Sequence, residues 1–118
     1  MEALTVQEEE LMQLVWKVKE GAIKNFIEAG SLELPYTTIA STMRNLEKKG
    51  YVQSKLFGNV YVYKPAIQEN DYKKKFIQKV VSNYFDSSYK EMVNFFVDQK
   101  KLSAKDLKEI IQLIESSK

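Results

Sequence analysis

The polar and basic side chains with the most regular spacing in this chain lie between Tyr36 and Lys49. Four of them recur at i, i+4, i+7 and i+11, namely Thr37, Ser41, Arg44 and Lys48. That spacing places them on one face of a helix. Hydroxyl groups hydrogen-bond bases and phosphates, arginine pairs with guanine or a phosphate, and asparagine pairs with adenine. The expected DNA contacts of this helix are Thr37, Thr38, Ser41, Arg44, Asn45, Lys48 and Lys49.

A short hairpin pattern follows this helix directly. Residues 51–56 and 60–64 read as two strands, and Phe57-Gly58-Asn59 reads as the turn between them. Lys55, Asn59 and Tyr61 are expected to reach the DNA backbone or the minor groove. From 36 to 64 there are five basic residues against one acidic residue, a local charge of +4, whereas the whole chain carries +2. This local excess favours contact with phosphates.

Composition argues against an enzyme. The chain of 118 residues has no cysteine and no histidine, so it lacks thiolate chemistry, the commonest general base and the commonest metal ligand. No glycine-rich phosphate loop accompanies its carboxylates. Glu8, Glu9 and Glu10 are interpreted as the solvated first turn of a helix. We expect no metal, no cofactor and no catalytic residue.

Nothing in the sequence predicts a membrane protein. Residues 1–11 are acidic and lack the basic and apolar regions of a signal peptide, and no apolar run approaches the roughly 18 residues of a membrane span. The expectation is a soluble protein of the cytoplasm without membrane association of its own.

The periodicity predicts a domain over residues 1–67. Apolar residues at helical spacing indicate a first helix at 6–18, and a second runs from Ile23 to about Gly30. The third helix is expected to begin at Tyr36 or Thr37, after Pro35, and to stop at Gly50. Trp16 is expected to belong to the core. Three helices followed by a hairpin predict a mainly α winged helix-turn-helix fold with a small β-hairpin wing.

Residues 68–118 carry helical signals only, in three stretches. Ser88 and Ser103 are the expected N-caps of the second and third of these helices. A segment this short has difficulty burying its apolar stripes alone, so we expect it to dimerise with a second copy of the chain. The expected dimerisation residues are Phe76, Val80, Tyr84, Phe95, Phe96, Leu107, Ile110, Ile111 and Ile114.

The segment from Tyr36 to Gly50, YTTIASTMRNLEKKG, followed by Tyr51-Val52, resembles the recognition helix of the BlaI/MecI/CopY repressors, the penicillinase repressor family. Leu4-Thr5 leading to Leu14-Val-Trp16 resembles the first helix of that family, and GNVYVYKP from Gly58 resembles its wing. The resemblance implies a homodimer that occupies a palindromic operator on double-stranded DNA and blocks transcription. Family wings often carry arginine directly after the turn glycine, where this chain has Asn59.

The resemblance also implies a mode of release. Repressors of the penicillinase and methicillin type are inactivated by a membrane sensor metalloprotease, which cuts an Asn-Phe bond in the tail. Asn94-Phe95 lies at the corresponding place here, and a cut would separate 107–114 from the DNA-binding half. The copper-responsive branch binds metal through C-terminal cysteines, which this chain lacks.

Two other interpretations remain open from the sequence. In one, the aromatic tail encloses a small apolar ligand that shifts DNA affinity. In the other, the winged helix binds a protein through an exposed patch of Leu56, Phe57 and the wing tyrosines.

Overall fold

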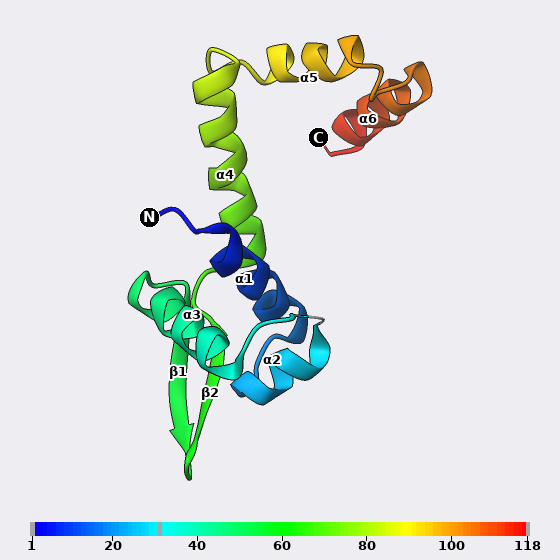
Figure 1. Ribbon diagram of the computed structural model, residues 1–118. Coiled ribbons are helices and arrows are strands. Elements are labelled where there is room, and N and C mark those ends of the chain that lie inside the picture. The colour runs from blue at the N-terminus through cyan, green and yellow to red at the C-terminus, as the bar shows by residue number, and fades with distance from the viewer. Residues whose placement is uncertain (1, 31, 118) are drawn as a thin grey trace. The chain divides into compact units, whose positions relative to one another are not determined.

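The computed structural model describes residues 2–30 and 32–117. Its elements in chain order are α1 (Val6–Val18), α2 (Ile23–Ala29), α3 (Tyr36–Lys48), β1 (Val52–Phe57), β2 (Val60–Pro65), α4 (Glu69–Tyr84), α5 (Tyr89–Asp98) and α6 (Ala104–Ser116) (Figure 1). The predicted mainly α fold with a small hairpin wing is confirmed. The chain forms two compact units, Met1–Tyr72 and Lys73–Lys118, so their boundary falls within α4.

Helix α1 begins at a reciprocal cap. The Thr5 hydroxyl accepts from the Glu8 amide at 3.1 Å, and Oε1 of Glu8 accepts from the Thr5 amide at 2.9 Å. Two of the amides left free at a helix start are thereby satisfied. The solvated character expected for Glu8 is wrong, because this residue is only 4% exposed. Its carboxylate turns back to cap the helix and also pairs with Lys49, the residue that follows α3.

One apolar core holds the first unit together. Helix α1 contributes Leu11, Met12 and Val15 to it, and α2 contributes Phe26. The inner face of α3 and the base of the hairpin complete this core with Ile39, Ala40, Met43, Leu46, Tyr51, Val52 and Tyr63. Burying one large aliphatic or aromatic side chain stabilises a fold by about 1.5–3 kcal/mol. The core therefore fixes the orientation of α3 about its own axis.

The end of α3 is set by Gly50. This residue has φ of 84°, a conformation that costs a side-chain-bearing residue about 1–2 kcal/mol. The amide of Tyr51 donates to the Leu46 carbonyl at 2.9 Å, and the amide of Gly50 donates to the Glu47 carbonyl at 3.0 Å. These two hydrogen bonds close the helix, and the chain continues directly into β1.

The hairpin pairs β1 with β2 antiparallel, with Val52 opposite Pro65 and Phe57 opposite Val60. Gly58 takes the left-handed conformation that the tight turn requires, with φ of 60°. A backbone bridge joins Gly21 to Tyr63 and ties the hairpin to the segment between α1 and α2. The hairpin projects beyond the three helices, with its turn at the free end (Figure 1).

The first turn of α4 is anchored to α1. Trp16 Nε1 donates to the Ile67 carbonyl at 2.9 Å, and its ring centroid lies 5.3 Å from that of Tyr72. The Tyr72 hydroxyl donates to Glu9 at 2.7 Å. Burial and this hydrogen bond raise the pKa of Tyr72. Trp16 therefore packs against the core as expected and also fixes the start of α4.

Helices α5 and α6 have good caps but no core of their own. The Ser88 hydroxyl accepts from the Glu91 amide at 3.2 Å, and Ser103 forms a reciprocal cap with Asp106. These are the expected N-caps. Within α5 and α6, all of whose residues are described, no side chain is buried. The rings of Phe85 and Phe95 meet at 5.6 Å between centroids.

Candidate nucleic-acid interface

Helix α3 divides into a buried face and an exposed face. Ile39, Met43 and Leu46 are almost completely buried, and Ala40 and Thr42 lie with them. On the opposite face Thr37, Arg44, Asn45 and Lys48 are exposed, and Ser41 is half-buried. Because the core holds the apolar face, the polar face presents a fixed set of donors and acceptors.

The hydroxyl groups at the start of α3 are partly engaged with the helix itself. Ser41 Oγ donates to the Thr38 carbonyl at 3.0 Å, and Thr42 Oγ1 donates to the same oxygen at 2.7 Å. Each hydroxyl retains lone pairs that can accept a further hydrogen bond. Thr42 is buried. The hydroxyl groups able to reach a base edge are therefore those of the exposed Thr37, at the first turn, and of the half-buried Thr38 and Ser41.

Three exposed side chains supply the charge and the amide of this face. Arg44 and Lys48 form no ion pair with any residue that the structure describes, and Asn45 supplies an exposed amide. A guanidinium and an ammonium without an acidic partner lose no internal contact when they meet phosphates or a guanine edge. Arg44, near the middle of the helix, is the one best suited to a bidentate base contact.

Lys49 has a different role from the one expected. Its Nζ donates to Glu8 Oε1 at 2.6 Å and to the Ala3 carbonyl at 3.0 Å. The side chain of Lys49 is 18% exposed and that of Glu8 is 6% exposed, so this ion pair is largely removed from water. A lysine held in this way is not free for a phosphate, and we remove Lys49 from the candidate DNA contacts.

The environment of Glu8 contains opposing effects on its pKa. Burial acts to raise the pKa of this carboxyl, whereas the hydrogen bond and charge of Lys49 and the donors of Thr5 act to lower it. The net result is a pKa below the ordinary value, so Glu8 is charged at neutral pH. The pair fastens the end of α3 to the start of α1.

A second contact joins α3 to the wing. Ser54 Oγ of β1 donates to Glu47 Oε2 of α3 at 2.5 Å. Glu47 is the only acidic residue between 36 and 64, and its carboxylate is turned to the hairpin base by this bond. The wing is therefore held in a defined position relative to the polar face of α3.

The expected wing residues lie along the outer half of the hairpin. Lys55, Asn59 and Tyr61 are all exposed, with Asn59 in the turn. Lys55 also lies with Lys64, Gln53 and Glu20 around a shallow hollow of about 190 Å³ on the hairpin. Lys64 was not among the expected contacts, although its place opposite Gln53 in the register puts it on the same face as Lys55.

Tyr36 is the other candidate that the sequence interpretation passed over. It is the first residue of α3 and remains exposed although it is a large aromatic residue. Recognition helices contact bases mainly through their N-terminal residues. The sequence signal for Tyr36 as a contact residue is an aromatic residue directly after a proline at the start of a helix.

A known protein family accounts for nearly the whole of this sequence. The model of the penicillinase repressor family matches residues 4–116, nearly the whole chain. The chain belongs to the penicillinase repressor family. The predicted resemblance is thus confirmed, and as a family member the protein is a DNA-binding transcriptional repressor.

Two curated relatives show how far this repressor has diverged. The penicillinase repressor of Bacillus licheniformis is 27% identical over 111 residues, which are 92% of this chain and 87% of the relative. The methicillin resistance regulatory protein MecI of Mammaliicoccus sciuri is 24% identical over 107 residues, which are 89% and 87% of the two chains. Among solved structures, Streptococcus pneumoniae FabT in complex with DNA aligns with a TM-score of 0.49 at 17% identity, over 98% of this chain and 78% of FabT.

This repressor belongs to a family of regulators rather than enzymes. None of the helices in its described residues combines the length and apolar character needed to cross a membrane.

Proposed function

We propose that this repressor binds a palindromic operator as a homodimer, with α3 of each protomer in the major groove. The observation that carries the proposal is the exposed face of α3, where Thr37, Ser41, Arg44, Asn45 and Lys48 lie together on a helix fixed by its buried side. In this arrangement Arg44 pairs with a base and Lys48 with a phosphate. The wing residues Lys55, Asn59 and Lys64 contact the flanking backbone. The proposal implies a cytoplasmic protein.

The tail supports the dimer in this proposal. Residues 68–118 are proposed as the dimerisation segment, and many of its large apolar residues are exposed in a single chain. They are Phe76, Ile77, Tyr84, Tyr89, Phe95, Phe96, Val97, Ile110, Ile111, Leu113 and Ile114. Soluble monomers rarely expose large apolar patches, so this number of exposed apolar side chains in one segment favours an interface. Val80 and Leu107, also expected in the interface, are half-buried. A second copy of the tail offers a matching apolar surface, as two-fold symmetry requires.

Proteolysis in α5 is the proposed route of release, with a membrane sensor metalloprotease as the partner. Asn94 is exposed near the middle of α5, where its amide lies 3.5 Å from Glu91 Oε1, and Phe95 is also exposed. A protease requires an extended substrate, so α5 has to unfold locally first. A helix without buried residues opens at low cost. A cut between Asn94 and Phe95 would detach α6 from the DNA-binding unit.

Selection of binding sites from a random DNA pool tests the proposal. A two-fold symmetric reader should recover a palindrome whose half-sites lie about 34–36 Å apart, or a multiple of this distance. Binding to the selected duplex should weaken steeply as salt rises, because phosphate contacts release counterions. Recovery of no motif, together with binding that is indifferent to salt, would contradict the proposal.

Substitution of Arg44 should remove sequence preference. We expect Arg44→Ala to lower the preference for the selected site over a scrambled duplex by roughly tenfold, because a bidentate base contact is lost. Arg44→Lys should restore the salt dependence but not the preference, since lysine lacks the planar fork. Fluorescence anisotropy titrations on both duplexes measure these effects.

Lys17→Ala is the matched control for Arg44. It also removes one exposed positive charge, but from α1 and outside the α3 face. If Lys17→Ala and Arg44→Ala changed the preference equally, the effect would be one of net charge, and the assignment of α3 as the reading helix would be wrong.

A further inference from the structure

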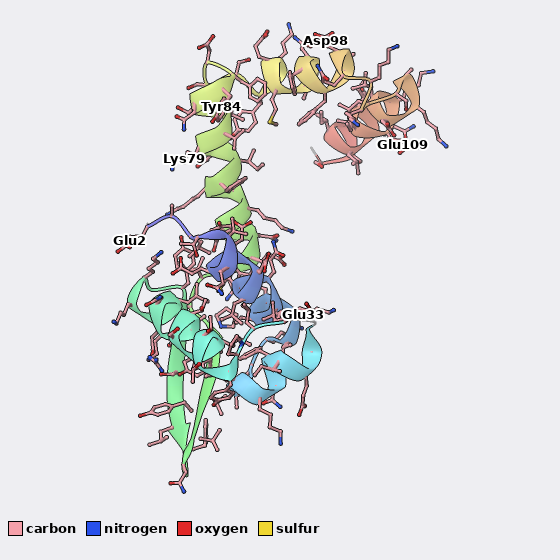
Figure 2. The ribbon with its side chains drawn as sticks, in the orientation of Figure 1. Glu2, Glu33, Lys79, Tyr84, Asp98 and Glu109 are labelled. Carbon is pink, nitrogen blue, oxygen red and sulfur yellow. The ribbon has the colours of Figure 1, made fainter. Side chains whose placement is uncertain are left out.

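The tip of the wing is apolar on both of its faces. Opposite residues in the register share a face, so Leu56 and Tyr61 lie on one side of the hairpin and Phe57 and Val60 on the other. All four are between 50% and 55% exposed. Side chains project to both sides of the hairpin near its turn (Figure 2). Neither face of the tip is covered by another part of the described first unit.

Because both faces of the tip are apolar, a partner with a groove would bury more of the tip than a partner with a flat surface. A protein docking on one face of the hairpin would leave the other pair of apolar side chains in water. Only a partner that encloses the tip removes both Leu56–Tyr61 and Phe57–Val60 from solvent. The two strands of the hairpin come together at its turn, beyond the pair Phe57 and Val60 (Figure 1).

The positive charge of the wing favours an anionic partner. Residues 52–65 contain Lys55 and Lys64 and no acidic residue. Lys55 Nζ lies 5.4 Å from the centroid of the Phe57 ring, so a positive charge sits directly beside the apolar tip. Glu20 is the one acidic residue that shares a hollow with these lysines, and it comes from the segment after α1 rather than from the tip. Cations beside exposed apolar side chains match phosphates that flank stacked bases.

We propose that Leu56, Phe57, Val60 and Tyr61 form a wedge that enters the DNA minor groove beside each half-site, partly unstacks a base step and bends the duplex. The inference rests on the proposed function, since it requires α3 to hold the wing at the DNA. Lys55 and Lys64, which share the hairpin face of Phe57 and Val60, bind phosphates of the backbone strand on that side of the groove. Apolar side chains inserted in this way kink DNA by about 20–90° towards the major groove.

Two measurements on the wild type test the wedge directly. The probe is the duplex recovered by site selection, with 2-aminopurine placed in turn at each adenine that flanks a half-site. Binding should raise the emission of 2-aminopurine at one step beside the half-site, because the analogue brightens when it loses its stacking partners. Energy transfer between dyes at the two ends should report a bend of about 20–90°.

Variants of Phe57 identify the side chain responsible. Phe57→Ala should abolish the rise in 2-aminopurine emission, reduce the bend and weaken binding by about tenfold. The salt dependence and the base preference set by α3 should not change, because no charge is removed. Phe57→Leu should retain most of the bend, since it preserves an apolar wedge. Val6→Ala is the control, a truncation of a 79% exposed apolar residue on α1.

The possible outcomes separate the wedge from the proposed function. If the wild type binds its site through Arg44 but neither unstacks nor bends the duplex, the wedge is wrong and the proposed function stands. The same conclusion follows if Phe57→Ala unstacks and bends DNA as the wild type does. If the wild type has no preferred site at all, both proposals fail.

Discussion

Replacing Ile111 and Ile114 with glutamate is expected to give a monomer that binds the operator about 10²- to 10⁴-fold more weakly than the wild type. Both residues are more than half exposed on the apolar face of α6 in a single chain. Buried in a dimer, each glutamate would lose hydration without gaining a partner. Without the dimer, binding at one half-site no longer raises the effective concentration of the second reading helix.

Sedimentation equilibrium and titration of the selected duplex measure the two consequences separately. Gln112→Glu is the control for one added negative charge, half the number in the double variant, because Gln112 lies on the opposite, polar face of α6. The control should remain dimeric and bind normally. A double variant that stays dimeric would place the interface elsewhere, and a monomer with unchanged affinity would remove the need for a dimer on the operator.

A chain that ends at Asn94 should behave like the double variant. It lacks all of α6 and the aromatic pair Phe95 and Phe96, whose centroids lie 5.9 Å apart. We expect a monomer whose circular dichroism retains the signal of the first unit, because the core of that unit contains no residue beyond Tyr63. Loss of the fold of the first unit would show that the cut acts on stability and not on dimerisation.

Lys49→Met is expected to lower the free energy of unfolding by about 2–3 kcal/mol. The variant leaves the Glu8 carboxylate largely buried without its cation, although the two Thr5 hydrogen bonds remain. The cost lies below that of a fully buried pair because the side chain of Lys49 keeps some contact with water. Lys48→Met makes the same chemical change at an exposed neighbour and should alter stability by less than about 0.5 kcal/mol. Urea unfolding followed by circular dichroism provides both values.

DNA binding should show the opposite ranking for these two lysines. At temperatures where both variants are folded, Lys48→Met should reduce the number of released counterions by about one per half-site, and Lys49→Met should leave it unchanged. The salt dependence of affinity for the selected duplex gives that number. If Lys49→Met lowered it as much as Lys48→Met, Lys49 would contact phosphate despite its pairing with Glu8.

The same ion pair predicts a pH dependence. The pKa of Glu8 is lower in the folded protein than in the unfolded chain, so the folded state is stabilised above the unfolded pKa. That contribution is lost as the pH falls through the folded pKa, since Glu8 must then take up a proton. Glu8→Gln removes the titrating group. The difference in stability between wild type and Glu8→Gln should therefore shrink in acid, which urea unfolding at several pH values can follow.

Local signals made most of the fold predictable. The limits of α1 and α3 follow from the Thr5 cap, from Pro35 and from Gly50, all within a few residues of the helices that they end. The hairpin follows from alternation around Gly58-Asn59. The reading face of α3 was predictable because an amphipathic helix has one polar side, and that side is the exposed one here.

Long-range partners were not predictable. Glu8 and Lys49 are 41 residues apart, and each resembles an ordinary surface charge on its own helix. Trp16 and Ile67 are 51 residues apart, so the anchoring of α4 has no local signal. Lys64 was missed because its place beside Lys55 depends on the strand register, whereas Tyr36 was missed although its position after Pro35 gave a local signal. The wedge also required the strand register, because a one-residue shift would exchange the faces of Leu56 and Phe57.

The unequal division of the core between the two units has a consequence for synthesis. Every member of the main core cluster lies at or before Tyr63, so the first unit is complete while the 46 residues of the second unit, Lys73–Lys118, are still being translated. At about 5–20 residues per second, that interval lasts about 2–9 s, and domains commonly fold as units during such intervals. The nascent chain can thus display a finished reading helix before its assembly helices leave the ribosome. Dimerisation then follows the folding of the DNA-binding unit. Until it occurs, the growing chain binds operator DNA only weakly and competes poorly with finished dimers.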